Sequence, residues 1–524
     1  MTKQPASNAT PLMSIMMFLQ FFTWGAWFAT LGAALNGNGL SGVIADAYAT
    51  APIAAIFAPL FLGLIADRFF ASEKVMGTLL VLGAAFLLVI PGLASSIEPE
   101  TKSAEQTVVA NEDGKKDQAA ADQSGEEKTA KDDAEKVKSD DGEEKEPTEA
   151  EKKTQRTGGI IVWLILAHMC CYMPTLGLGN TIAFTHIVDQ NDFPKIRVWG
   201  TIGWIVAGLV VGGLGWSSSM SIFWLAGICS AVLGLFCFML PNTPPPLKGK
   251  PFDVRSLLMV DAWKLMKDWN FLVFAVCSTL ICIPLAYYYG STSQFLTQTG
   301  FSQPAATMTL GQMSEIFFML LIPFFFRRLG FKIMIMIGMA CWVVRYALFA
   351  FGAPEQISWM LLSGVAIHGI CYDFFFVTGF MYTDQKAPVE IRGQAQALLV
   401  FLTQGVGMFI GYRIMGAGSF LGINFGWTIG DYGQQVTSSE AYGQALKEAS
   451  GEGEAIGFFE TFGRMFSRDL PEKLDPTLLS ETMLQWKNFW MLPSIMALGI
   501  LVIFALTFWD KGQLEEDEKG NPAK

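Results

Sequence analysis

The chain alternates between long apolar segments and short polar ones along almost its whole length. A helix needs about 20 predominantly apolar residues to cross the hydrocarbon core of a bilayer. Twelve segments reach this length, and we expect each to form one membrane-spanning helix: 12–35, 44–66, 75–96, 159–187, 196–215, 219–240, 269–295, 305–326, 331–352, 357–381, 394–420 and 487–509. The pattern therefore predicts an all-α polytopic membrane protein.

Polar stretches group these helices into two sets of six. The predicted order is helices 1–3 in 1–96, a loop in 97–158, helices 4–6 in 159–240, a cytoplasmic linker in 241–268, helices 7–11 in 269–420, an insertion in 421–486, helix 12 in 487–510 and a tail in 511–524. Two bundles of six helices are the arrangement of major facilitator transporters, whose binding site lies near the midplane between the halves. We expect this fold.

Charge adds detail to the two long polar segments. The net charge of −11 lies mostly in 97–158, which holds 19 acidic and 11 basic residues with few aromatic ones. Such a segment cannot bury enough apolar surface to order itself, so we expect a disordered exoplasmic loop. The insertion 421–486 contains the apolar run AIGFFETFGRMF at 455–466. This run predicts either an amphipathic helix on the membrane surface or a cap over the outer mouth.

Basic residues in the short loops predict the orientation. On a twelve-span arrangement they all fall on one side: Arg68, Lys74, Lys195, Lys248, Lys250, Arg255, Lys264, Lys267, Arg327, Arg328, Lys332, Lys386 and Arg392. The positive-inside rule makes that side cytoplasmic and places both termini there.

Several function classes are excluded by what the sequence lacks. No basic cluster with interleaved aromatic residues suggests nucleic acid as a partner. There is no HExxH, GxSxG or P-loop motif, and the histidines and cysteines match no metal-site spacing. We therefore expect neither an enzyme nor a metal site.

Polar residues inside the first six spans point to a site. Arg197, Thr201 and Trp204 are spaced i, i+4, i+7, so they share one stripe of a helix. A charged group in a span is costly unless it faces a polar cavity or a partner. Alternatively, Arg197 reaches the membrane interface as an anchor. Both interpretations remain open at this stage.

The last six spans carry a second polar set. Gln312 and Glu315 lie three residues apart on one helix face, and a carboxylate deep in a span needs a proton or a cationic partner. His368 and Tyr372 are one turn apart, while Asp373 is rotated by about 100° from Tyr372. Asp373 either cycles a proton or pairs with an arginine, for which the candidates are Arg345 and Arg413. One or two of the tyrosines 287–289 are expected to face inward.

These residue types favour a neutral solute with hydroxyl groups and a flat ring. Aromatic faces stack on such a ring, and amides and carboxylates accept hydrogen bonds from hydroxyl groups. Carboxylates near an arginine also offer a way to couple transport to protons, because protonation changes which pairs form.

Six segments carry a resemblance to a known family. They are FLQFFTWGAWFATLG (18–32), YMPTLGLGNTIAF (172–184), DFPKIRVWGTIGW (192–204), GQMSEIFFMLLIPFF (311–325), RYALFAFGAP (345–354) and HGICYDFFFVTG (368–379). They resemble the corresponding segments of bacterial nucleoside:proton symporters of the major facilitator superfamily. The resemblance covers nearly all spans and implies a multi-pass protein of the bacterial inner membrane.

The resemblance also implies roles for individual residues. Arg197, Thr201 and Trp204 match residues that line the nucleoside site. Gln312 and Glu315 match an amide and an acid that bind base or ribose, and Glu315 is also a candidate for proton coupling. Tyr372 matches an aromatic wall residue and Asp373 a coupling carboxylate.

Three positions depart from the family pattern or match it only in part. His368 stands where tyrosine is usual, and Ala286 and Tyr289 stand where polar amides are expected; His368 and Tyr289 remain candidate binding residues. The segment GLIADRFFASEK (63–74) resembles the superfamily's signature loop, which implies a gating role for Asp67 and Arg68.

The sequence thus predicts a secondary active transporter that imports nucleosides by proton-coupled symport with alternating access. The expected form is a monomer in the lipid bilayer, with a nucleoside as its small-molecule partner and the proton as coupling ion in place of any cofactor. Two alternatives are a symporter for a sugar or other small polar metabolite and a non-transporting solute receptor.

Overall fold

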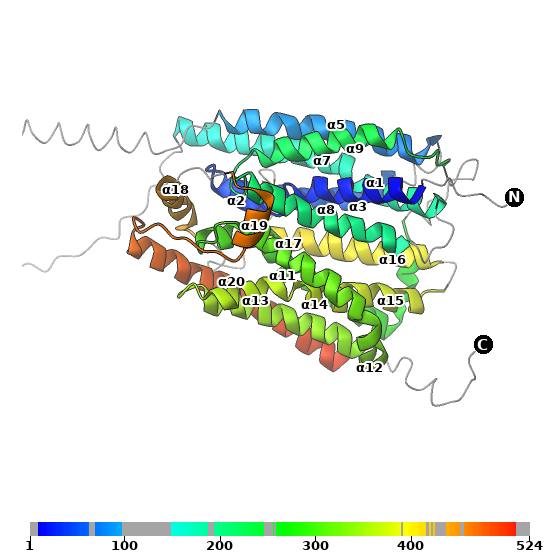
Figure 1. Cartoon of the computed structure of the whole chain (residues 1–524). Helices are drawn as coiled ribbons and strands as arrows, with labels where there is room; N and C mark the ends of the chain where they lie inside the picture. The colour runs from blue at the N-terminus through cyan, green and yellow to red at the C-terminus, as the bar shows by residue number, and fades with distance from the viewer. Residues whose placement is uncertain are drawn as a thin grey trace, which may run out of the picture.

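The computed structural model describes residues 9–61, 69–96, 148–186, 193–245, 255, 258–388, 391–415, 419–420, 423–424, 436–450 and 455–509. The predicted gating residues Asp67 and Arg68 and most of the acidic loop 97–158 lie outside these ranges. The described chain is almost entirely helical, and its helices run roughly parallel to one another (Figure 1).

The first half consists of α1 (Ala9–Gly25), α2 (Leu31–Asn36), a 3₁₀ turn (Ser41–Val43), α3 (Ile44–Phe61), α5 (Ser72–Ala94), α7 (Glu149–His186), α8 (Phe193–Gly213) and α9 (Ile222–Cys237). A 3₁₀ turn at Ala262–Lys267 precedes the second half. That half comprises α11 (Trp269–Gln298), α12 (Pro304–Gly352), α13 (Ser358–Ala366), α14 (His368–Tyr372), α15 (Thr378–Lys386), α16 (Arg392–Val400), α17 (Met408–Met415) and α20 (Pro476–Thr507).

Among the described residues, nine helices are long and apolar enough to cross a membrane. α12 contains two of the predicted spans, which meet at a kink at Gly330. The φ of Gly330 is 65°, a left-handed conformation that glycine adopts without steric cost. α1 with α2, the shorter α9, α13 to α15, and α16 with α17 each occupy one predicted span. The predicted class, an all-α polytopic membrane protein of two six-helix bundles, is confirmed.

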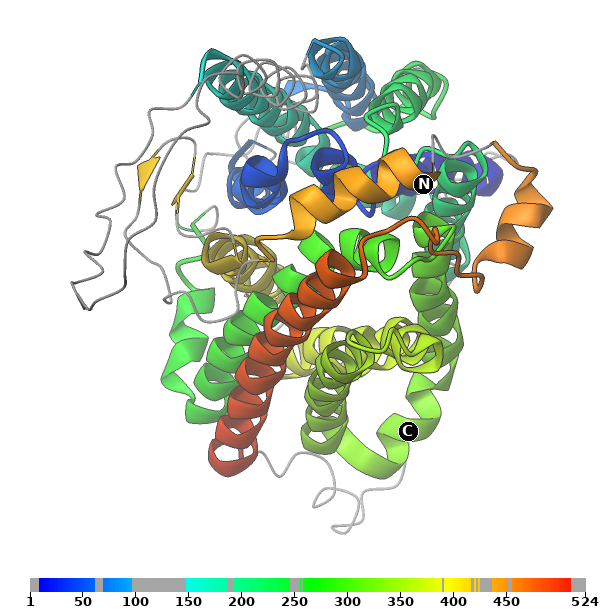
Figure 2. The ribbon, with the colours of Figure 1, turned by 90° about the vertical axis from the view of Figure 1, so that its left-hand side faces the viewer.

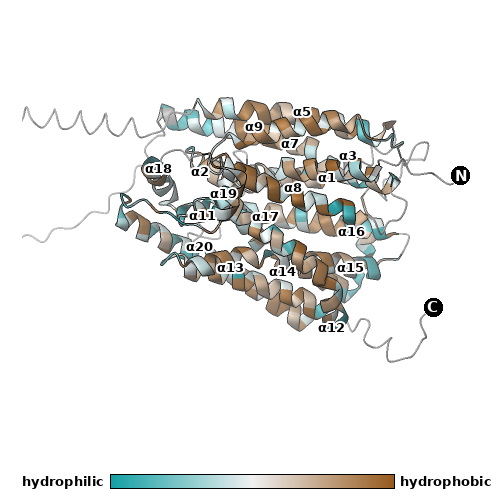
Figure 3. Cartoon of the chain, in the orientation of Figure 1, coloured by the Kyte–Doolittle hydropathy of each residue, from teal (hydrophilic) through white to brown (hydrophobic). Residues whose placement is uncertain are grey.

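Apolar side chains dominate the middle of the helices, and hydrophilic ones gather toward the two ends (Figure 3). α1 begins and α20 ends at the same end of the molecule (Figure 1). Many large apolar side chains remain exposed on the outer helices, for example Leu235, Leu320 and Leu506. Exposure of this kind fits a lipid-facing surface.

Two spans begin at least ten residues before their apolar windows, at 149 instead of 159 and at 476 instead of 487. α7 begins at Glu149, within the segment expected as a loop, because Thr148 and Glu151 form a reciprocal capping box: each backbone N–H donates to the other's side chain. α20 begins at Pro476 instead of 487, because Asp475 caps it by accepting a 2.9 Å hydrogen bond from the Thr477 backbone N–H. Both helices therefore extend beyond the predicted membrane region.

The insertion between α17 and α20 forms small elements at the end opposite the first residues of α1. They are a two-stranded antiparallel hairpin, β1 (Ser419–Phe420) and β2 (Ile423–Asn424), and two helices, α18 (Ser439–Ser450) and α19 (Phe458–Arg464). α18 lies across that end between helices of the two halves (Figure 2).

The run 455–466 was predicted to form either an amphipathic helix on the membrane surface or a cap over the outer mouth. The run 455–466 forms α19, which buries Thr461 against α8 and leaves Phe459 86% exposed. α18, instead of this run, covers the end of the bundle.

Candidate functional site

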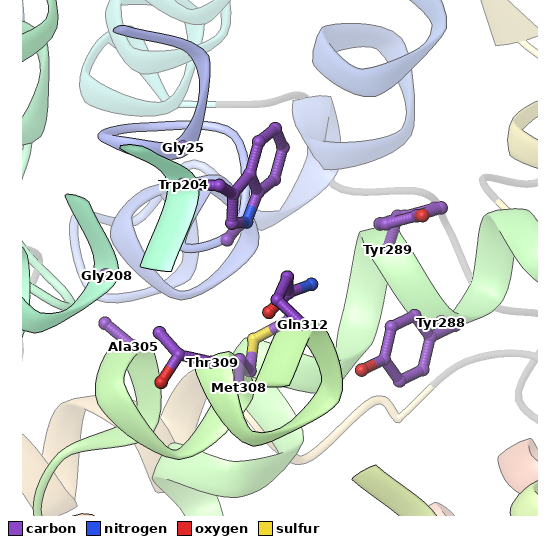
Figure 4. A pocket seen from close by; sticks show the side chains of 10 residues that line it. Gly25, Trp204, Gly208, Tyr288, Tyr289, Ala305, Met308, Thr309 and Gln312 are labelled. Atoms are coloured by element: carbon purple, nitrogen blue, oxygen red, sulfur yellow. The ribbon is translucent and has the colours of Figure 1, made fainter. Parts of the chain in front are cut away.

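A narrow cavity lies between the two halves. Its lining comes from α1 and the turn after it, α8, α11 and α12: Gly25, Ala29, Trp204, Gly208, Tyr288, Tyr289, Ala305, Met308, Thr309 and Gln312. In Figure 4, Trp204 reaches in from the α8 side, and Gln312 and Tyr289 face it from α12 and α11. The cavity combines aromatic rings with a few polar groups, which is typical of a small-molecule site.

The first half presents its polar stripe on α8. Trp204 packs edge-on against Trp24 of α1 with ring centroids 5.5 Å apart. One turn earlier on the same stripe is Thr201, and one turn before that is Arg197, whose Cζ lies 4.0 Å from the centroid of the Phe21 ring. Arg197 is half-buried and stacks on an aromatic ring of α1, which is how a guanidinium is held inside a bundle.

The second half contributes an amide and an acid from α12. Gln312 lines the cavity, and Glu315, three residues further along, is half-buried. Glu315 lies within electrostatic range of Arg197 and Tyr372, although the described side chains of Glu315 and Arg197 form no ion pair. A basic residue of one half and an acidic residue of the other therefore lie within electrostatic range of each other.

Tyrosines of α11 divide between the cavity and the core. Tyr288 and Tyr289 line the cavity, while Tyr287 packs against Phe489 of α20 with ring centroids 5.2 Å apart. The sequence predicted that one or two of tyrosines 287–289 face inward and named only Tyr289 as a candidate binding residue. The helical rotation of about 100° per residue allows two consecutive side chains to border one cavity, but it does not tell which two.

His368 lies beside this cavity wall. Its ring stacks on that of Tyr288, with ring centroids 5.2 Å apart and an interplanar angle of 15°. The ring centroid of Tyr372, on the same helix, lies 5.9 Å from that of His368. The Nδ1 atom of His368 is 3.0 Å from Nη2 of Arg345. Both residues are almost fully buried.

Asp373 occupies a special position in the second half. It begins a π-helical turn, Asp373–Val377, directly after α14, and such turns are frequent at functional sites. Its side chain is fully buried, and neither carboxylate oxygen has a hydrogen-bond partner among the described residues. A second π-helical turn, Phe401–Gly407, interrupts the next span.

The arginine pairing considered for Asp373 is wrong for both candidates. Arg345 bonds to His368, and Nη2 of Arg413 forms a 2.7 Å ion pair with Oδ1 of Asp46. Asp46 belongs to α3 and Arg413 to α17, so this pair joins the two halves. Spacing along one helix could not reveal it, because the partners belong to spans that are distant in sequence.

Comparisons with known proteins show the family of the chain. The chain matches the family described as "Nucleoside H+ symporter" over residues 8–101 and 150–423. It is 38% identical over 421 residues to a putative nucleoside transporter, YegT, of Escherichia coli K12, a match covering 78% of this chain and 84% of the relative. It is 28% identical over 428 residues to the nucleoside permease NupG of the same organism, covering 77% and 86%.

A solved structure shows the same fold. The crystal structure of the nucleoside transporter NupG superposes with a TM-score of 0.65 at 23% identity, covering 96% of this chain and all of that chain. At this identity the likeness bears on the fold, not on the ligand.

Proposed function

Because the chain belongs to the nucleoside H+ symporter family, we propose that it imports nucleosides together with protons by alternating access of one central site. The family's members and the relatives described above are transporters, so the chain is a transporter and not an enzyme. It is a multi-pass membrane protein whose substrate is a small molecule.

The observation that carries the proposal is the pairing of aromatic and polar groups from both halves around one cavity. Trp204, Tyr288 and Tyr289 offer flat faces for a base, and Gln312 offers an amide that both donates and accepts hydrogen bonds. Arg197 and Thr201 on α8, and Glu315 and Tyr372 in the second half, extend this set toward ribose hydroxyl groups.

The cavity in this structure is too small for a nucleoside. It has room for about one water molecule. The two halves must therefore move apart to admit a nucleoside, as alternating access requires.

Two carboxylates are proposed to couple transport to protons. Asp373 is buried without a hydrogen-bond donor or cation among the described residues, and an ionised carboxylate is costly in such a place. Glu315 faces Arg197 across the halves, so its protonation would alter the attraction between them. We propose the proton as the coupling ion, with no other cofactor.

The orientation and assembly belong to the same proposal. Basic residues of the short loops support a position of both termini on the cytoplasmic side of a bacterial inner membrane. α18 and α19 would then face the exoplasmic side, and the protein would work as a monomer.

Uptake into proteoliposomes tests the function directly. Labelled uridine and adenosine are offered with and without an inward proton gradient, with protein-free liposomes as control. Symport predicts accumulation that a protonophore abolishes. Absence of uptake of both, with folded protein in the membrane, would overturn the proposal.

A substitution at Arg197 tests the proposed binding role. Arg197→Ala is expected to weaken nucleoside binding roughly tenfold or more, because a charge-assisted hydrogen bond is lost in a partly buried site. The matched control is Lys195→Ala, which removes an exposed charge two residues earlier on the same helix. Binding is measured by titration calorimetry; equal behaviour of the two variants would favour a membrane anchor.

A further inference from the structure

Arg345 is a fully buried cation whose only hydrogen bond among the described residues goes to a histidine. It lies in the second part of α12, with no exposed surface, and its Nη2 is 3.0 Å from Nδ1 of His368. Its Nε and Nη1 atoms have no hydrogen-bond partner within the described part of the chain. The Cζ atom also lies 4.1 Å from the centroid of the Tyr288 ring, so the guanidinium is held over an aromatic face.

This contact determines where the imidazole proton must be. A guanidinium carries five N–H donors and no acceptor, and it stays charged in proteins. The short Arg345 to His368 contact is therefore a hydrogen bond only if Nδ1 of His368 carries a lone pair. A neutral imidazole with an unprotonated Nδ1 carries its proton on Nε2.

The same contact disfavours a charged imidazole. Protonation at Nδ1 would turn that atom into a second donor, 3.0 Å from a guanidinium nitrogen in a buried place. Two cations at this distance repel each other, and burial strengthens the repulsion. His368 is therefore held neutral and does not carry the coupling proton.

The imidazole of His368 lies directly behind Tyr288, one of the residues that line the cavity. The Nε2 atom of His368 makes no hydrogen bond with any described residue. It also keeps some accessible surface, since it does not belong to the fully buried polar atoms without a partner. Tyr288, which lines the cavity, stacks on the ring, and Tyr289 stands edge-on to it with centroids 6.3 Å apart. The ring thus presents an N–H donor beside the aromatic wall proposed to receive the base.

We propose that Arg345 is a positioning residue that fixes His368 as an Nε2–H donor, and that this donor selects bases carrying an oxygen acceptor at the edge it meets. The proposal rests on the proposed nucleoside transport. Exocyclic oxygens of hypoxanthine and uracil accept a hydrogen bond, whereas the amino groups of adenine and cytosine at the same positions donate. Inosine and uridine are therefore favoured over adenosine and cytidine.

Nitrogen NMR of the wild-type protein tests the tautomer, and a substitution serves only to assign the signals. The full chain is labelled with ¹⁵N-histidine, and the signals of His368 are identified by their loss in His368→Gln, since the chain holds only three histidines. The expected spectrum shows an unprotonated Nδ1 and a protonated Nε2. A protonated Nδ1, or protons on both nitrogens, would overturn the proposal.

Binding ratios in matched variants test the selectivity. The affinity of inosine over adenosine, and of uridine over cytidine, is expected to be about tenfold in the wild type, because the wrong base leaves a buried donor facing a donor. Arg345→Lys keeps a group that only donates and should keep the ratio. Arg345→Gln supplies an amide oxygen that can accept a hydrogen bond from a protonated Nδ1. The imidazole can then also adopt the tautomer with its proton on Nδ1, and the affinity ratio should fall to near one.

The outcomes separate this proposal from the function on which it rests. A ratio near one in the wild type, or an unchanged tenfold ratio in Arg345→Gln, would overturn the selectivity while nucleoside transport stands. If none of the four nucleosides binds the wild type, the proposed function fails and the selectivity fails with it. The NMR spectrum decides the role of Arg345 in either case.

Discussion

At the scale of single residues, three ionisable side chains buried in the second half have different partners. Arg345 donates to a histidine, Arg413 faces Asp46 of the other half, and Asp373 has no hydrogen-bond partner among the described residues. Unpaired buried charge is costly, so proteins keep it where it serves a function. Asp373 is therefore the residue in this set whose protonation most directly changes the energy of the bundle.

Replacement of Asp373 by an uncharged isostere separates coupling from transport. Asp373→Asn is expected to abolish gradient-driven accumulation in proteoliposomes, because the side chain can no longer gain and lose a proton. Exchange of labelled for unlabelled nucleoside should persist, since the substrate site is left in place. A variant that still concentrates nucleoside under a proton gradient would show that another group carries the proton.

The matching test at Glu315 asks whether the two carboxylates share the task. Glu315→Gln keeps the side-chain shape but removes the anion that faces Arg197. Because Glu315 is also proposed to contact the substrate, this variant should weaken binding roughly tenfold and reduce accumulation, in contrast to Asp373→Asn, which should leave binding nearly intact. Calorimetric titration of both variants distinguishes the two roles.

At the scale of elements, α18 joins the halves at one end of the bundle, which is the outer end in the proposed orientation. Ser439 receives hydrogen bonds from Gln294 and Gln298 of α11. On its other side, α18 is bonded to the first half: Ser41 donates to Glu440, and Lys447 donates to the Gly37 carbonyl. A helix bonded to both halves at one end must release one of them before that end can open.

A larger side chain where α18 contacts the first half should favour the state in which this end of the bundle is open. A Cβ on Gly443 of α18 would lie only 2.6 Å from Oδ1 of Asn36, whereas a Cβ on Gly463 of α19 meets nothing within 4 Å. Gly443→Val should therefore raise the outward-open population by roughly tenfold, and Gly463→Val should leave it unchanged. Spin labels at positions 42 and 448, in a chain without its native cysteines, report the distance between α18 and the first half.

At the scale of the whole molecule, the predictable features and the unpredictable ones have different physical origins. The spans follow from composition alone, because bilayer thickness fixes the length of an apolar helix. The capping box of Thr148 and Glu151 is also a local signal, although the apolar window did not include it. The partners of Arg345 and Arg413 depend on how distant helices pack, and helical spacing records only which residues share a face.

Polar contacts between the described halves gather at the end that carries α18. They include the Asp46–Arg413 ion pair, a 3.3 Å hydrogen bond from Gln298 to Asn36, and the α18 bonds to Ser41 and Gly37. The rings of Tyr48 and Tyr412, which are near neighbours of Asp46 and Arg413 in the sequence, stack with centroids 5.4 Å apart. These contacts hold the end that carries α18 closed in this structure, so the proposed alternating access would have to break them in each cycle.

The Asp46–Arg413 pair provides a test of that requirement. Arg413 is only 3% exposed, and removal of one partner of a buried ion pair costs about 3 kcal/mol or more. Asp46→Asn should therefore destabilise the closed outer end by roughly that amount, lower the thermal stability in detergent and shift the spin-label distance toward the open state. Glu460→Gln removes one partner of the half-exposed Arg464–Glu460 pair and should cost less than about 1 kcal/mol.

A second substitution decides whether the effect belongs to the pair. The double variant Asp46→Asn with Arg413→Gln removes both charges of this pair, so much of the lost stability should return. The coupling energy from the double-mutant cycle should then exceed that of the exposed pair. If Asp46→Asn and Arg413→Gln add without coupling, the ion pair does not hold the outer end closed, and α18 with its hydrogen bonds must carry the closure by itself.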